Sequence, residues 1–200
     1  MTILILGTLL FFTFHLIPSF KVLHVPLITQ LGEGGFRGLY IAGSVTGMIL
    51  IIVGKATADY VPLWTPPLEA NHAAAIMMLP ACILFAAMAI PTNLKRYTRH
   101  PMLWGVVFWS VAHCLANGDL ASIICFGAFG AFALRSMWSL NHRGAAFSTA
   151  KVNVAYDALV IITGVIGYGL LVWLHPYLFG VAPISKVAFF FTAWVTKAVN

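Results

Sequence analysis

Residues 101–138 read PMLWGVVFWSVAHCLANGDLASIICFGAFGAFALRSMW, two apolar runs divided by a short polar break. Neither run alternates polar and apolar residues as the strands of a transmembrane barrel do, so both are predicted to be helices. Pro101 suits the first position of a helix, because its missing N–H would be unpaired there. Gly118 suits the position just after the first helix, and Asp119 can cap the second. The stretch therefore predicts a helical hairpin inside a membrane.

The composition of the whole chain supports this assignment. Its 200 residues are 61% hydrophobic and 8% charged, and the mean hydropathy is +0.95. An average soluble domain is about 25% charged, so this chain cannot cover a water-facing surface. The composition excludes an ordinary cytosolic enzyme, a disordered protein and a secreted disulfide scaffold. Cys82, Cys114 and Cys125 lie within apolar runs, without metal or redox spacing, and are expected to be buried thiols.

Similar apolar runs recur along the chain, which predicts an all-α fold: an integral membrane helical bundle forming a single domain over residues 1–200. About six transmembrane helices fit this length. They are expected at Ile3–Ile17, Leu39–Val53, Ala73–Ile90, Pro101–Asn117, Leu120–Trp138 and Val154–Leu174. The C-terminal run Val187–Val195 is too short to span a bilayer, so we expect a short apolar helix at the interface or packed on the bundle.

The positive charges predict how the bundle is oriented. The net charge is +6, and the cations lie in short loops, so the positive-inside rule explains them without a nucleic-acid partner. We define face A as the membrane face reached after the first span and face B as the opposite face. Six spans place eight cations on face A and three on face B, which predicts that face A is cytoplasmic and that both termini are periplasmic. The face A cations are Lys21, Arg37, Lys95, Arg96, Arg99, Arg135, Arg143 and Lys151, and those of face B are Lys55, Lys186 and Lys197.

Seven histidines stand out in so apolar a chain, because ionisable groups inside a membrane are costly. His113 shares one helical face with Ser110 and Asn117. This polar stripe is consistent with two interpretations, hydrogen bonding between helices or a ligand for a metal or haem, and the residues alone leave both open.

His15 lies late in the first span, on a face with Thr8, Phe12 and Ser19. The helical rise predicts that His15 and His113 differ in depth by about 8–10 Å in the bilayer. Such a pair can hold one haem iron only in a tilted arrangement. His72 or His175 on face B are geometric substitutes.

Catalytic motifs are few. The chain has no HExxH, GxSxG or phosphate-binding glycine loop, and no pair of buried carboxylates for acid–base chemistry is expected. Asp119 is explained as a helix cap and Asp157 lies at the face A end of the sixth span. A transporter needs buried charges or paired broken helices, and Pro80 is a single candidate break.

Several sequence blocks resemble the NnrU family of bacterial inner-membrane proteins along nearly the whole chain. These blocks are Leu31-Gly32-Glu33, Arg37-Gly38-Leu39-Tyr40, Pro91-Thr92-Asn93, Arg99-His100-Pro101-Met102-Leu103 and Ala112-His113-Cys114-Leu115-Ala116-Asn117-Gly118-Asp119. The family takes its name from a gene linked to the expression of nitrite and nitric oxide reductases in denitrifying bacteria. Its biochemical activity is not defined.

NnrU proteins are in turn similar to the plant zeta-carotene isomerase, a membrane protein with haem b. This resemblance implies that His15 and His113 bind the haem iron. His100 is expected at the face A surface, because Pro101 opens the helix and Arg99 precedes it, and we expect it to have a positioning role, in which its imidazole bonds to water, a loop carbonyl or a haem propionate. The isomerase's alternative cysteine ligand falls at Ser110, which is a poor ligand for haem iron. Ser110 and Asn117 share the helical face of His113 and are candidates to support the cofactor.

Three functions remain on this basis. The first is a haem b membrane protein with a redox-linked role in denitrification or an isomerase-like reaction. The second is a non-enzymatic accessory or assembly factor, and the third is a small transporter. The expected partners are membrane lipid and either an apolar small molecule or respiratory membrane proteins.

Overall fold

The structure is a computed structural model that describes residues 1–183, and within that range it is helical, without strands. The C-terminal run Val187–Val195 lies outside the described residues. The elements are α1 (Thr2–Leu16), η1 (Ile17–Ser19), α2 (Lys21–Ala56), α3 (Leu68–Ala89), η2 (Asn93–Arg96), α4 (Pro101–Ala116), α5 (Leu120–His142) and α6 (Val154–Phe179).

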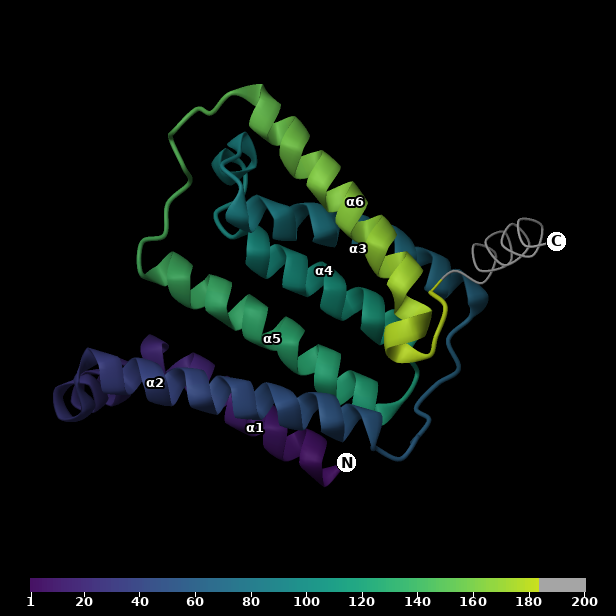
Figure 1. Ribbon diagram of the computed structural model, residues 1–200, viewed down its shortest axis with the longest axis horizontal. Coiled ribbons are helices and arrows are strands. Elements are labelled where there is room, and N and C mark those ends of the chain that lie inside the picture. The colour runs from purple at the N-terminus through teal and green to yellow at the C-terminus, as the bar shows by residue number, and fades with distance from the viewer. Residues whose placement is uncertain (184–200) are drawn as a thin grey trace.

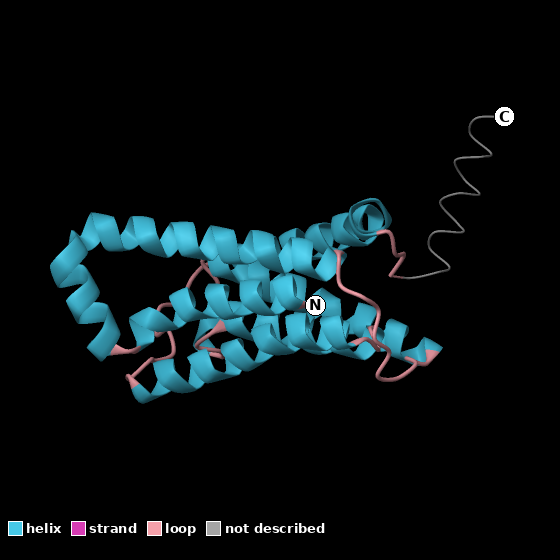
Figure 2. Ribbon diagram, turned by 90° about the horizontal axis from the view of Figure 1, so that it is seen from below, coloured by secondary structure: helices cyan, strands magenta, loops and turns pink. Residues whose placement is uncertain are grey.

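The long helices run back and forth, so that successive connections lie at opposite ends of the bundle (Figure 1). A view turned by 90° shows the same bundle of roughly aligned helices (Figure 2). Within residues 1–183, five segments are long and apolar enough to cross a membrane, and α4 is apolar but only 16 residues long. The predicted all-α membrane bundle is thereby confirmed. The helix α3 continues through Pro80 without a break.

Large apolar side chains cover the outside of the bundle. On α6, Ile161, Ile162 and Ile166 are each more than half exposed, at 52%, 55% and 57%. Water would make such a surface costly, whereas the hydrocarbon core of a bilayer makes it favourable. These side chains therefore contact membrane lipid.

The helices α1 and α2 pack as a tight hairpin, and glycines at their contact allow the close approach. A Cβ atom added at Gly47 would lie 2.7 Å from the backbone nitrogen of Phe11, and one at Gly7 would lie 2.7 Å from that of Ile51. At Gly54 an added Cβ would meet the backbone of Leu4. Helices in lipid associate through such close packing, since no hydrophobic force drives them together.

Four glycines of α5 and α6 divide into two groups. Gly130 packs on Ser110 and Gly164 on the backbone of Ile83, so both allow a close helix crossing. Gly127 and Gly167 have no atom within 4 Å of an added Cβ, so these two glycines do not provide a close helix crossing. They lie on faces of α5 and α6 that no neighbouring helix approaches.

The largest difference from the predicted spans is in α2. The helical ribbon begins at Lys21, whereas the second span was expected to begin at Leu39. Gly32 has φ +68° and ψ 167°, so the helix is broken there and changes direction. Residues 21–31 form a helical elbow, and the polar, glycine-rich stretch GEGGFRG at residues 32–38 separates it from the apolar run of the second span. Only a glycine adopts this backbone conformation at little cost.

At face B, Asp119 joins the end of α2 to the start of α5. Its carboxylate accepts a hydrogen bond from the backbone N–H of Ser122 at 2.9 Å, which confirms the predicted cap of α5, and pairs with Lys55 Nζ at 3.2 Å. Gly118 has a different role from the expected one, because its φ is not positive. A side chain there would strike the carbonyl of Trp64, so Gly118 is the position where the α2–α3 loop crosses the α4–α5 turn.

At face A, Asp157 makes the equivalent connection. Its carboxylate accepts bonds from the Thr92 hydroxyl at 2.6 Å, from the backbone N–H of Asn93 at 2.8 Å and from the Asn93 side chain at 2.7 Å. These bonds fix the connection after α3 to the first turn of α6.

Candidate functional site

His113 lies in the last turn of α4 and is half-buried. Its Nδ1 is 2.8 Å from the carbonyl oxygen of Trp109. A carbonyl only accepts hydrogen bonds, so Nδ1 carries the proton and the lone pair of a neutral ring is on Nε2. The ring centroid lies 4.5 Å from that of Phe126 and 5.2 Å from that of Trp109. The imidazole is therefore held in one orientation among aromatic rings.

His15 has the same local arrangement at the end of α1. Its Nδ1 is 2.9 Å from the carbonyl oxygen of Phe11, which again leaves the lone pair on Nε2. The ring stacks on Phe11 at 4.0 Å between centroids and lies 5.3 Å from Tyr40 and 5.8 Å from Phe132. His15 thus lies where α1, α2 and α5 meet.

An aromatic seam separates the two histidines. The term aromatic seam denotes Phe11 and Phe12 of α1, Trp109 of α4, and Phe126, Phe129 and Phe132 of α5. Phe129 lies at its centre, with its ring centroid 5.4 Å from that of Phe11 and 5.5 Å from that of Trp109. The rings of His15 and His113 are not in contact, and the path of contacts between them runs through Phe129.

The depth difference between the two histidines follows from their contacts on α5. His113 lies against Phe126 and His15 against Phe132, six residues further along that helix. A rise of 1.5 Å per residue gives an offset of about 9 Å along α5. The structure therefore places the two imidazoles on the same seam at different depths, and does not bring them together.

Ser110 and Asn117 have structural partners. The Ser110 hydroxyl donates to the carbonyl of Phe126 at 2.6 Å and is buried where α4 crosses α5. The Asn117 side chain donates to the backbone carbonyl of His113 at 2.8 Å, which satisfies one of the free carbonyls at the end of α4. Neither side chain touches the imidazole ring of His113.

His100 and Arg99 lie at the opposite end of α4 from His113. The 13 residues between His100 and His113 correspond to about 20 Å of helix. His100 Nε2 is 3.0 Å from the side-chain oxygen of Asn141 on α5, and Arg99 donates to the carbonyl of Ala145 at 3.2 Å. Sequence reasoning missed Asn141 and Ala145, because contacts 41 and 46 residues apart leave no local pattern.

Three further histidines make local contacts. His142 bonds to the carbonyl of Trp138 four residues earlier, His175 bonds to the carbonyl of Val181, and His24 packs on Phe36. Within residues 1–183, no group of three or more His, Cys, Asp or Glu residues is spaced to hold a metal ion. A haem iron differs from such a site, since one or two protein ligands suffice for it.

The carboxylate of Asp119 is held by structural partners. Burial alone would raise the pKa of Asp119, but the hydrogen bonds from Ser122 and the contact with Lys55 outweigh it, and the pKa lies below its usual value. Asp119 is therefore an ionised structural group.

Comparison with known proteins supports the resemblance seen in the sequence. No curated protein and no solved structure matches the chain. The NnrU protein family matches residues 3–183, a range that covers all six helices and both histidines of the aromatic seam. The chain belongs to the NnrU family.

Proposed function

We propose that this membrane protein binds haem b and takes part in a redox-linked reaction of the respiratory membrane associated with nitrite and nitric oxide reduction. The observation that carries the proposal is the arrangement of His113 and His15. Each imidazole has Nδ1 bonded to its own helix and its Nε2 lone pair available, next to the aromatic seam. Aromatic and apolar side chains with a few fixed polar groups are typical of cofactor sites.

The surroundings of the two imidazoles fit an iron ligand. Second-sphere carbonyls that accept from Nδ1 orient the ring and increase the basicity of the other nitrogen. The carbonyls of Trp109 and Phe11 have this role. When bound, haem b supplies a one-electron iron couple whose potential depends on the axial ligands and their hydrogen bonds. Phe126 and Phe132 exclude water from the sides of the two rings.

His113 is proposed as the first ligand and His15 as the second. An offset of about 9 Å along α5 separates them, and Phe129 lies on the path between them. One iron shared by both imidazoles requires the ring of Phe129 to leave its contacts with Phe11 and Trp109. If Phe129 keeps them, only one of the two histidines would hold the iron.

An isomerase-like reaction by ligand exchange is less well supported. Such an exchange needs a soft second ligand, and Ser110 occupies the relevant position. The Ser110 hydroxyl is already bonded to the carbonyl of Phe126. Electron transfer or redox sensing, which need no ligand exchange, therefore fit the residues better.

A non-enzymatic accessory factor for respiratory enzymes is the second candidate. The observation that favours it is that the carboxylates of Asp119 and Asp157 both serve to join helix ends. These two carboxylates therefore have structural partners that account for them without an acid–base role.

The test is haem uptake by the purified protein. The protein in detergent is titrated with haemin, and the Soret absorbance is compared for the wild type, His113→Ala, His15→Ala and His142→Ala. His142 is a matched control, because it makes the same bond to a carbonyl four residues earlier and also lies beside a tryptophan, but is exposed at face A. We expect His113→Ala to abolish stoichiometric uptake, His15→Ala to change the spin state, and His142→Ala to resemble the wild type.

The proposal also includes the location and orientation of the protein. We infer the bacterial inner membrane, with face A in the cytoplasm and both termini in the periplasm. The support is the excess of lysine and arginine in the loops of face A.

A further inference from the structure

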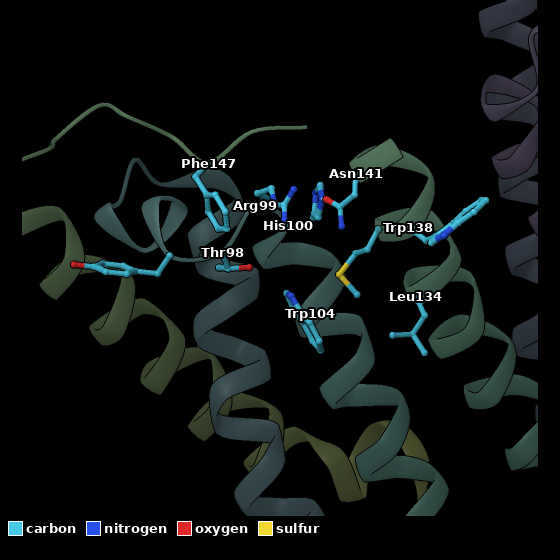
Figure 3. A pocket seen from close by; sticks show the side chains of 10 residues that line it. Thr98, Arg99, His100, Trp104, Leu134, Trp138, Asn141 and Phe147 are labelled. Atoms are coloured by element: carbon cyan, nitrogen blue, oxygen red, sulfur yellow. The ribbon is translucent and has the colours of Figure 1, made fainter. Parts of the chain in front are cut away.

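A cavity of about 380 Å³ opens between α4 and α5 at face A. Figure 3 shows Arg99, His100 and Asn141 at one end of it, with Trp104 and Leu134 further along the helices. The cavity is therefore amphipathic, polar toward the loops of face A and apolar toward the membrane.

Arg99 is held over the polar end by two contacts. Its Nη1 donates to the carbonyl of Ala145 at 3.2 Å, and its guanidinium carbon lies 4.7 Å from the centre of the Phe147 ring. One bond to a carbonyl leaves further N–H donors of the guanidinium for another acceptor. The carbonyl and the ring fix the cation in place, which reduces the entropy lost when it binds an anion.

One further donor lies at the same end. The buried Oγ1 of Thr98 has no hydrogen-bond partner among the described residues, although Thr98 lines the cavity. A hydroxyl donates one hydrogen bond to an acceptor such as a phosphate oxygen. The cation of Arg99 and the unpartnered hydroxyl of Thr98 therefore line the same end of the cavity.

The apolar end is open to lipid. Leu134 and Trp138 of α5 are 52% and 61% exposed, and Trp104 of α4 is 41% exposed. Tryptophan is typical of the boundary between headgroups and hydrocarbon. A ligand that fills the cavity therefore has an anionic head and a hydrocarbon body.

We propose that this cavity binds an anionic phospholipid, with its phosphate between Arg99 and Thr98 and its acyl chains along Leu134 and Trp138. Basic pockets between transmembrane helices on the cytoplasmic side are a known mode of headgroup recognition. The site is independent of the proposed haem function, because it lies about 20 Å along α4 from His113.

The test uses the full chain reconstituted in phosphatidylcholine vesicles that contain a minor fraction of brominated phosphatidylglycerol, which quenches nearby tryptophan. Brominated phosphatidylcholine at the same fraction is the reference lipid. We expect phosphatidylglycerol to quench more strongly in the wild type, and Trp104→Phe and Trp138→Phe to remove most of the difference. Equal quenching by the two lipids would overturn the proposal.

Two variants and one matched control assign the headgroup site. We expect Arg99→Gln to weaken the preference for phosphatidylglycerol about fivefold. Thr98→Val keeps the side-chain shape and removes only the unpartnered hydroxyl, so we expect it to fold normally and to weaken the preference about threefold. Arg143→Gln removes the same charge from the same face outside the cavity and should leave the preference unchanged.

Three results would each contradict the proposal. If Arg143→Gln lowers the preference as much as Arg99→Gln, the lipid responds to the overall charge of face A and the cavity is not its site. If inorganic phosphate at millimolar concentration removes the difference in quenching, the site recognises a soluble anion and the phospholipid assignment is wrong. If Thr98→Val folds and keeps the full preference, the phosphate does not lie where it is proposed.

Discussion

Lys55 Nζ lies 3.2 Å from Asp119 Oδ1, across 64 residues of sequence, and this ion pair fastens the end of α2 to the start of α5. The same carboxylate also caps α5 through Ser122. One side chain therefore connects the α1–α2 hairpin to the rest of the bundle at face B.

Removal of this carboxylate should destabilise the protein. Asp119→Ala takes away the cap of α5 and leaves Lys55 without its partner, so we expect a loss of about 1–2 kcal/mol in the free energy of unfolding. The measurement is the thermal midpoint in detergent. Asp59→Ala removes another face B carboxylate, one that makes no hydrogen bond or ion pair within residues 1–183, and should change the midpoint little. Equal midpoints for wild type and Asp119→Ala would show that the connection is unimportant.

The contribution of Asp119 should depend on pH. Its pKa in the folded protein lies below the usual value, because the bonds from Ser122 and Lys55 outweigh the effect of burial. A lowered folded-state pKa stabilises the fold above the unfolded-state pKa of about 4, and this contribution is lost as the pH falls through the folded-state value. The difference in thermal midpoint between wild type and Asp119→Asn should therefore be full at about pH 6 and shrink below about pH 4. A difference that grows on acidification would contradict the assignment.

Two glycine-to-alanine substitutions should affect stability differently, because only one of them lies where α1 and α2 approach closely. Gly47→Ala places a methyl group 2.7 Å from the backbone nitrogen of Phe11, so the helices must move apart, at a cost of about 1–3 kcal/mol. Gly167→Ala meets nothing within 4 Å and adds helix propensity, so it should be neutral or slightly stabilising. Thermal midpoints of the two variants give the comparison, and a larger loss for Gly167→Ala would mean that the hairpin is not packed as described.

The orientation can be tested with two exposed tyrosines. Tyr60 lies in the connection at face B and is 70% exposed, whereas Tyr97 lies at face A and is 77% exposed. A membrane-impermeant maleimide applied to spheroplasts should label Tyr60→Cys, and should label Tyr97→Cys only after lysis. The wild-type chain is the background control, since Cys82 and Cys125 are buried and Cys114 is half-buried. The reverse labelling pattern would invert the orientation.

Much of the fold could be predicted from the sequence because each membrane span requires a continuous apolar run, which the sequence shows directly. The predicted start of α4 at Pro101 and the cap at Asp119 are both present. The elbow of residues 21–31 could not be predicted, because it depends on the backbone conformation of one residue, Gly32, in a polar stretch. The role of Gly118 depends on the Trp64 carbonyl, 54 positions earlier, which no local pattern reveals.

The candidate site was only partly predictable. Helical spacing identified His113 and His15 individually, and their depth offset follows from the helical rise. It could not reveal that Ser110 is occupied by the carbonyl of Phe126, or that Phe129 lies between the two histidines. Those contacts depend on how α4 and α1 pack on α5, and packing partners in a bundle are not encoded in the period of any single helix.

The most direct test of the haem proposal is the absorbance spectrum of the protein purified from its native membrane, before and after reduction with dithionite. We predict a Soret band in the oxidised protein that shifts on reduction, with a haem content close to one per chain that is lost in His113→Ala. A purified, folded protein that shows no Soret band and takes up no added haemin would contradict the account.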